Sequence, residues 1–365
     1  MAQRNYEIDA IKGFAIFLVV LGHVIFLLVP NDGFHNSIME LARMIYTFHV
    51  RLFFFISGYL IFPTFGPNLI NWTKKKFMAL IIPYINFTII YFYFLHGFSL
   101  ESIASNEARW WFFGDLIHKL GSFITPDSAW FLPVLFELFV SIAIIITFET
   151  KMGKYGKYVF PAFFLLFLII LPISPIARIK GVDQFIMFLP FVMGGYYINY
   201  FEDMLVNTDK KNHHIIYLIG FSSYPLLYFI QFITPLVNIN GENLLSYYYY
   251  TLLSISGILL SILFIKLLTG KLIRHIQTVF AACGIYSMEI YLTHLIVLYY
   301  FVYYHLSLWP NSGIIGVFMG TLSILLVSLA ISFVLSYNKW VSRLFFARWS
   351  FKTIMGLFKM AQSHD

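Results

Sequence analysis

The sequence is poor in charged residues and in cysteine. Only 11% of its 365 residues are charged, whereas soluble domains carry about 25%, so a soluble globular domain is excluded as the main architecture. The single cysteine, Cys283, has no partner in the chain for a disulfide, and it excludes a metal site built on several thiolates. No soluble basic domain is present that would use the net charge of +7 to bind nucleic acid.

Apolar and aromatic residues are what the chain has in abundance. Hydrophobic residues make up 60% of the sequence, aromatic residues make up 20%, and the mean hydropathy is +0.79. We expect an all-α, polytopic integral membrane bundle of about ten transmembrane helices over residues 1–337, embedded in a lipid bilayer. The windows long enough to cross the hydrocarbon are 11–29, 44–62, 77–95, 130–148, 158–173, 184–200, 214–232, 247–268, 280–304 and 313–337.

The basic residues alternate between the two sides of these windows. Of the 24 Lys and Arg residues, 18 fall in one set of alternate segments and six in the other. Because cytoplasmic loops collect Lys and Arg, this alternation predicts ten spans with both termini in the cytoplasm. Residues 338–365 then form a basic amphipathic cytoplasmic tail, which suits a helix lying on the inner leaflet.

A histidine lies in the middle of the first membrane-length window. An ionisable side chain at that depth is costly, so His23 is a candidate functional residue. Eleven helical steps separate it from Lys12, which corresponds to about 20° beyond three full turns and a rise of about 16 Å. Lys12 and His23 are therefore predicted to lie on one stripe of one helix, with the cation nearer the cytoplasm.

Further polar residues in the apolar windows extend the candidate site. They are His49, Arg51, Glu289 and His294. Glu289 and His294 are about 140° apart around a helix axis and cannot share a face, whereas Tyr291 and His294 can. For His49 and His294, a hydrogen bond to a backbone carbonyl is an alternative to a functional role.

Four blocks of the sequence resemble the acyltransferase-3 family of integral membrane acyltransferases. Within that family the chain is similar to sugar and polysaccharide O-acetyltransferases such as fucose 4-O-acetylases. The blocks are Ile8–Lys12 with Gly22–His23, Phe48–Tyr59, Ala129–Pro133, and Tyr286–His294. The resemblance implies transfer of an acyl group from acetyl-CoA to a hydroxyl of a sugar or polysaccharide, such as O-antigen, capsule or exopolysaccharide, without a metal. It also implies a bacterial inner-membrane protein whose acceptor is carried on an undecaprenyl lipid or at the cell surface.

The resemblance also suggests roles for individual residues. His23 is expected to be the general base, or alternatively to carry the acyl group, with Lys12 and Asp9 completing the catalytic set. Lys12 and the lysines at 74–76 are expected to hold the coenzyme phosphates, although positive-inside anchoring explains those three lysines equally well. The supporting residues are His49, Arg51, Ser57, Trp130, Glu289, Tyr291 and His294.

Two positions depart from the family pattern. Many members have arginine where this chain has Lys12, and the second block commonly has proline where Arg51 stands. Arg51 could contact an acidic acceptor, such as a uronic acid or a lipid-linked phosphate, or pair with a nearby carboxylate. A transporter or glycan export component stays open as an alternative function, although no internal repeat relates the two halves of the chain. The sequence does not indicate an oligomeric state.

Overall fold

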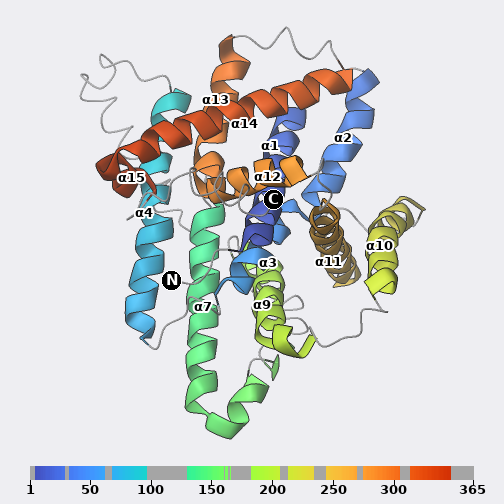
Figure 1. Ribbon diagram of the computed structural model, residues 1–365, viewed down its shortest axis with the longest axis vertical. Coiled ribbons are helices and arrows are strands. Elements are labelled where there is room, and N and C mark those ends of the chain that lie inside the picture. Colours follow the sequence, from blue (N-terminus) through green and yellow to red (C-terminus); the bar gives the residue numbers. More distant parts are fainter. Residues whose placement is uncertain are drawn as a thin grey trace. The chain divides into compact units, whose positions relative to one another are not determined.

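Regular structure is entirely helical in the part of the chain that the structure describes. The computed structural model (Figure 1) describes residues 5–28, 33–61, 68–96, 130–159, 161–162, 165, 182–205, 213–233, 244–268, 274–304 and 313–346. These residues form helices, turns and bends, with no strand among them. The predicted all-α class is therefore confirmed over these ranges.

The helices follow the apolar windows closely, apart from two breaks described below. Their bounds are α1 Tyr6–Leu28, α2 Gly33–Tyr46, α3 His49–Tyr59, α4 Leu69–His96, α7 Phe131–Lys151, a 3-10 helix η2 Gly153–Tyr158, α9 Val182–Leu205, α10 His213–Ile233, α11 Leu244–Leu267, α12 Arg274–Ile285, α13 Ser287–Tyr304, α14 Gly313–Tyr337 and α15 Lys339–Phe346.

Within the described residues, four helices are long and apolar enough to cross a membrane. They are α1, α7, α11 and α14, and the bent pair α12 and α13 makes a fifth if it counts as one span. The chain is thus consistent with a multi-pass membrane protein, while ten spans and two cytoplasmic termini remain predictions. The window at 158–173 and the tail beyond 346 lie mainly or wholly outside the described residues.

Two of the predicted windows are not single straight helices. In the window at 44–62, α2 ends at Tyr46 and a new helix, α3, begins at His49. In the window at 280–304, α12 and α13 meet at Tyr286 with a bend of 83°. Neither break contains proline, and Gly284 precedes only the second, so hydropathy alone gives no sign of the first.

The described residues divide into two compact units. The first takes residues from 1–62 and 194–333, and the second from 63–193 and 334–351. In the first unit, α1 packs against α2, α3, α11, α12 and α13, and α10 packs against α11. About two thirds of the most apolar stretch of α1 is buried (67%), against 39% for α14, so α1 is the more enclosed helix.

The contact between α1 and α12 brings two backbones together. A Cβ built on Gly13 would lie 1.7 Å from the carbonyl oxygen of Phe280, and one on Gly284 would lie 1.7 Å from the carbonyl oxygen of Asp9. Lipid tails are as apolar as side chains, so helices in membranes associate through such close packing of small residues. The two glycines therefore determine how closely α12 approaches the first half of α1.

The second unit places α7 and α15 against α4 (Figure 1). Phe346 of α15 is buried and stacks on Phe87 of α4, with ring centroids 5.8 Å apart. Trp340 of α15 is 77% exposed, and the Arg343 guanidinium lies over its indole ring. The start of the predicted tail is thus a short amphipathic helix.

Replacing Gly284 with alanine should destabilise the protein strongly. The added methyl group meets the backbone of Asp9, which cannot move aside as a flexible side chain would. Overpacking of this kind costs about 1–3 kcal/mol, occasionally more. Thermal unfolding of the purified protein in detergent measures the effect. Gly194→Ala is the matched control, because a Cβ at Gly194 meets nothing within 4 Å, and an unchanged unfolding temperature for Gly284→Ala would contradict the packing.

Candidate active site

Three histidines from three helices gather around the second half of α1. The His23 ring of α1 lies 5.2 Å from the His294 ring of α13, measured between centroids. Tyr46, the last residue of α2, lies 6.3 Å from His23 and 4.7 Å from His49, the first residue of α3. His49 and His294 are fully buried, and His23 is half-buried. The structure therefore brings together the histidines that the sequence could only propose separately.

Each of these histidines donates its Nδ1 proton to its own backbone. Nδ1 of His23 lies 2.9 Å from the Val19 carbonyl oxygen, and Nδ1 of His49 lies 2.8 Å from that of Ile45. Because a carbonyl oxygen only accepts hydrogen bonds, each Nδ1 must carry the proton. In the neutral ring, Nε2 then keeps its lone pair and can act as a base.

His294 also donates its Nδ1 proton to its own backbone. Its Nδ1 lies 2.7 Å from the carbonyl oxygen of Tyr291 and 3.0 Å from that of Ile290. Its Nε2 is buried and has no hydrogen-bond partner among the described residues. The backbone hydrogen bond offered as an alternative for this residue is therefore present at Nδ1, and a functional role for Nε2 beside His23 stays a prediction.

Tyr46 is a member of this cluster that the sequence analysis missed. Its ring lies against His23, His49 and Phe26, and a Cβ built on Gly22 would come within 2.6 Å of its Cε2 atom. Glycine at position 22 therefore makes room for the tyrosine ring. Tyr46 precedes His49 by three residues, a spacing that places two residues on one face of a continuous helix, but the two belong to different helices here.

Side chains from other helices satisfy the backbone at the break between α2 and α3. Tyr224 of α10 donates to the Met44 carbonyl oxygen at 2.8 Å, and Ser254 of α11 donates to the Thr47 carbonyl oxygen at 2.6 Å. The guanidinium of Arg51 donates to the same Thr47 oxygen at 2.8 Å. These bonds satisfy the carbonyl oxygens at the break and therefore stabilise the position at which α3 begins.

Arg51 is near both aromatic and ionisable groups. It interacts electrostatically with Tyr247 and Tyr250 of α11, and with His49 two residues before it. Part of its hydrogen-bonding capacity is used on the carbonyls of Tyr46 and Thr47. Arg51 thus connects the histidine cluster with the tyrosine-rich start of α11.

At the beginning of α1, Lys12 and Asp9 form an ion pair. The Nζ atom of Lys12 lies 2.8 Å from Oδ1 of Asp9, and the Asp9 side chain is 6% exposed against 21% for Lys12. The pair lies one helical turn apart, beside the close contact between Gly284 and the Asp9 backbone. The structure thus joins two of the proposed catalytic residues, while their role in catalysis stays a prediction.

The other predicted residues of the first unit lie on α3 and α13. Ser57 is half-buried near the end of α3. Glu289 is fully buried on α13, as is His294, so α13 is enclosed on both of the faces that these residues occupy. Tyr291 is half-buried, with its ring 5.9 Å from that of His294.

The predicted residues of the second unit have separate surroundings. Lys74 and Lys75 are exposed, whereas the ammonium of Lys76 lies 4.7 Å from the centre of the Phe139 ring and 5.2 Å from that of Trp72. Such cation–π contacts are structural, so Lys76 differs from its two neighbours. The Trp130 ring stacks on Phe188 at 5.5 Å. A shared role with the histidines of the first unit stays a prediction.

The geometry suits proton transfer in an apolar environment. Three imidazoles have Nδ1 bonded to a backbone carbonyl, which leaves Nε2 as the basic nitrogen. The Tyr46 ring lies against two of them, His23 and His49, and the His294 ring lies against that of His23. No group of three or more His, Cys, Asp or Glu side chains within the described ranges is arranged to hold a metal ion. Because a neutral imidazole can accept a proton at Nε2, these residues are suited to acid–base chemistry on a bound substrate.

Comparison with known proteins gives a family and one partial relative. The family model described as "Acyltransferase domain" matches residues 5–337, which is nearly the whole chain. A nodulation protein, NolL of Sinorhizobium fredii, is 40% identical over 57 residues, and this match spans 16% of the chain and 16% of that protein. No solved structure matches the chain. The family match confirms the resemblance seen in the four sequence blocks.

Gly22 and Tyr46 should be energetically coupled. Gly22→Ala pushes the added methyl group into the Tyr46 ring and should lower the unfolding temperature. Tyr46→Leu removes the ring atoms that the methyl group would meet, so the double variant should be less destabilised than the sum of the two single variants. We expect a coupling energy of about 0.5–3 kcal/mol in a double-mutant cycle of thermal unfolding. Simple additivity would contradict this contact.

Proposed function

The chain belongs to the acyltransferase family whose model it matches, and from this premise we propose that it is a membrane-bound O-acyltransferase. We propose acyl-CoA, in the first place acetyl-CoA, as the donor and a sugar hydroxyl of a cell-surface or lipid-linked polysaccharide as the acceptor. The observation that carries the proposal is His23, a half-buried base in an apolar helix, with a second histidine 5.2 Å away.

The reaction needs a base at the acceptor hydroxyl. Attack of the hydroxyl oxygen on the thioester carbonyl forms the new ester C–O bond and, as the tetrahedral intermediate collapses, breaks the C–S bond. The hydroxyl proton passes to Nε2 of His23, whose Nδ1 is held by Val19, and then to the departing thiolate. The backbone bond keeps the ring in the tautomer that this transfer requires.

Tyr46 and His294 support the same step. A tyrosine hydroxyl is a suitable donor to the oxyanion that develops on the thioester carbonyl, and the Tyr46 ring packs against His23. The Nε2 of His294 is a second acceptor within the same buried group. Transfer through an acyl-histidine at His23 is a covalent variant of this mechanism.

The donor is proposed to approach from the Lys12 end of α1. Coenzyme A carries phosphates, and an ammonium is a suitable partner for them. The ion pair with Asp9 holds the Lys12 side chain beside the start of α1, and Lys74 and Lys75 are exposed cations of the second unit. We further propose ten spans in a bacterial inner membrane with both termini in the cytoplasm, since this topology places Lys12 on the side where acyl-CoA is made.

Replacing His23 with alanine should abolish acyl transfer. Loss of a general base lowers the rate by about 10²–10⁴-fold, so we expect less than about 1% of the ester formed by the parent protein. Inside-out vesicles supplied with labelled acetyl-CoA report ester formation on the glycan. His275→Ala is the control, because His275 is exposed on α12. A His23→Ala protein present at normal level with substantial residual activity would remove His23 from the mechanism, and solute movement without ester formation would indicate a transporter.

Replacing Lys12 with glutamine should raise the KM for acyl-CoA by about tenfold, because one charge-assisted phosphate contact is lost. The same substitution at Lys154, an exposed lysine of the 3-10 helix, should leave KM unchanged. Initial rates over a range of acyl-CoA concentrations separate the two parameters. A fall in kcat at constant KM would show that Lys12 does not hold the donor.

A further inference from the structure

A second polar group lies where α10 and α11 pack together. Tyrosines occupy positions 247–250 at the start of α11. On α10, Tyr224, Tyr228 and Gln231 are spaced by about one helical turn, and the two helices pack together. Tyrosine is common in this chain, with 25 in 365 residues, but four in succession at the start of one helix, beside a glutamine of another, form a local concentration. Their concentration at one helix pair therefore needs an explanation beyond packing.

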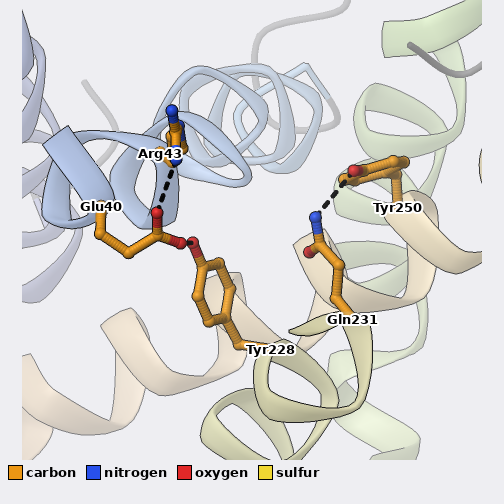
Figure 2. Close-up of polar contacts among 5 residues, drawn as sticks. All are labelled: Glu40, Arg43, Tyr228, Gln231 and Tyr250. Carbon is orange, nitrogen blue, oxygen red and sulfur yellow. Dashed lines mark hydrogen bonds and ion pairs between the residues drawn. The ribbon is translucent and has the colours of Figure 1, made fainter. Parts of the chain in front are cut away.

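Part of this group is already satisfied. Figure 2 shows Glu40 of α2 between the Arg43 guanidinium, at 2.8 Å, and the hydroxyl of Tyr228, which donates to it. The Arg43 side chain is 63% exposed. Glu40, Arg43 and Tyr228 thus form hydrogen bonds among themselves at the edge of the unit, and this triad links α2 to α10.

The neighbouring pair, Gln231 and Tyr250, has hydrogen-bonding capacity left over. Nε2 of Gln231 donates to the hydroxyl of Tyr250 at 2.9 Å (Figure 2). The Oε1 atom of Gln231 is buried and has no hydrogen-bond partner among the described residues. An unpaired buried acceptor costs about 1–3 kcal/mol, and the Tyr250 hydroxyl beside it can still donate its own proton. The pair therefore offers an acceptor and a donor side by side.

A positive charge stands next to this pair. The Arg51 guanidinium and the Ser254 hydroxyl both donate to the Thr47 carbonyl oxygen, and Ser254 lies one helical turn after Tyr250 on α11. The guanidinium is therefore close both to the start of α11 and to the break that precedes His49. A ligand bound along this line would meet aromatic faces, a donor–acceptor pair and a cation before reaching His49.

We propose that these residues bind the acceptor and that the acceptor is a glycan carrying a negative charge. The hydroxyl of one sugar pairs with Gln231 and Tyr250, its apolar ring face lies on the tyrosines of α11, and its carboxylate or phosphate pairs with Arg51. This inference rests on the proposed function, because it names the acceptor class of the same reaction. It assigns specificity to Arg51, Gln231 and Tyr250, which the histidine chemistry does not require.

Binding without any acyl donor tests the acceptor class. The purified full chain in detergent is titrated with three matched oligosaccharides: one containing hexuronate, the same one with its carboxylates reduced to alcohols, and the neutral one carrying a terminal phosphate. We expect tighter binding of at least one charged probe than of the reduced probe, by about tenfold or more. Preference for the hexuronate or for the phosphate identifies the charged group. Equal affinity for all three would overturn the proposal.

Substitutions locate the site. Arg51→Gln should lower the affinity for the charged probe by about tenfold, Arg51→Lys should restore part of it, and Arg274→Gln, which removes the same charge from an exposed position on α12, should have no effect. Gln231→Glu should weaken binding of the charged probe more than binding of the reduced probe, since the new carboxylate repels only the former. Equal loss for both probes would show that Gln231 has a merely structural role.

The two proposals fail separately. If charged and neutral probes bind alike while ester formation still depends on His23, the acceptor assignment is wrong and the acyltransferase assignment stands. If the charged probe binds through Arg51 but no ester forms from labelled acetyl-CoA, the binding site stands and the proposed reaction is wrong.

Discussion

The close approach of α1 and α12 is the contact on which the candidate site depends. Gly13 and Gly284 let two backbones meet where any side chain would clash, and no large hydrophobic driving force is needed for such packing in a membrane. With α12 held there, the 83° bend at its end directs α13 along α1. His294 reaches His23 because of this bend.

A second constraint acts at the break between α2 and α3. Phe48, the residue before α3, makes no side-chain capping bond, so the local sequence does not stabilise the helix start. Tyr224 and Ser254 from other helices, and Arg51 of α3 itself, instead donate to the carbonyl oxygens of Met44 and Thr47, which the break leaves without their helical partners. The position of His49 is therefore a property of the assembled helices, and the residues that fix it also border the proposed acceptor site.

The sequence predicted well what depends on composition and on one helix at a time. The all-helical class and the family follow from local patterns. It missed Tyr46, and it did not show the break after that residue, because neither proline nor glycine marks it. Contacts such as Gln231 with Tyr250 need the register of two helices, which no single-helix periodicity contains.

The contact at Gly284 separates two kinds of sequence change. Glycine meets the carbonyl oxygen of Asp9, not its side chain. Every residue has this carbonyl, so the contact with Gly284 does not itself require aspartate at position 9, whereas the ion pair with Lys12 requires a carboxylate there. In a mutational scan, position 9 should report on the chemistry at this end of α1, and position 284 on assembly. Natural substitutions could change the charge at position 9 while the backbone contact at position 284 stays the same.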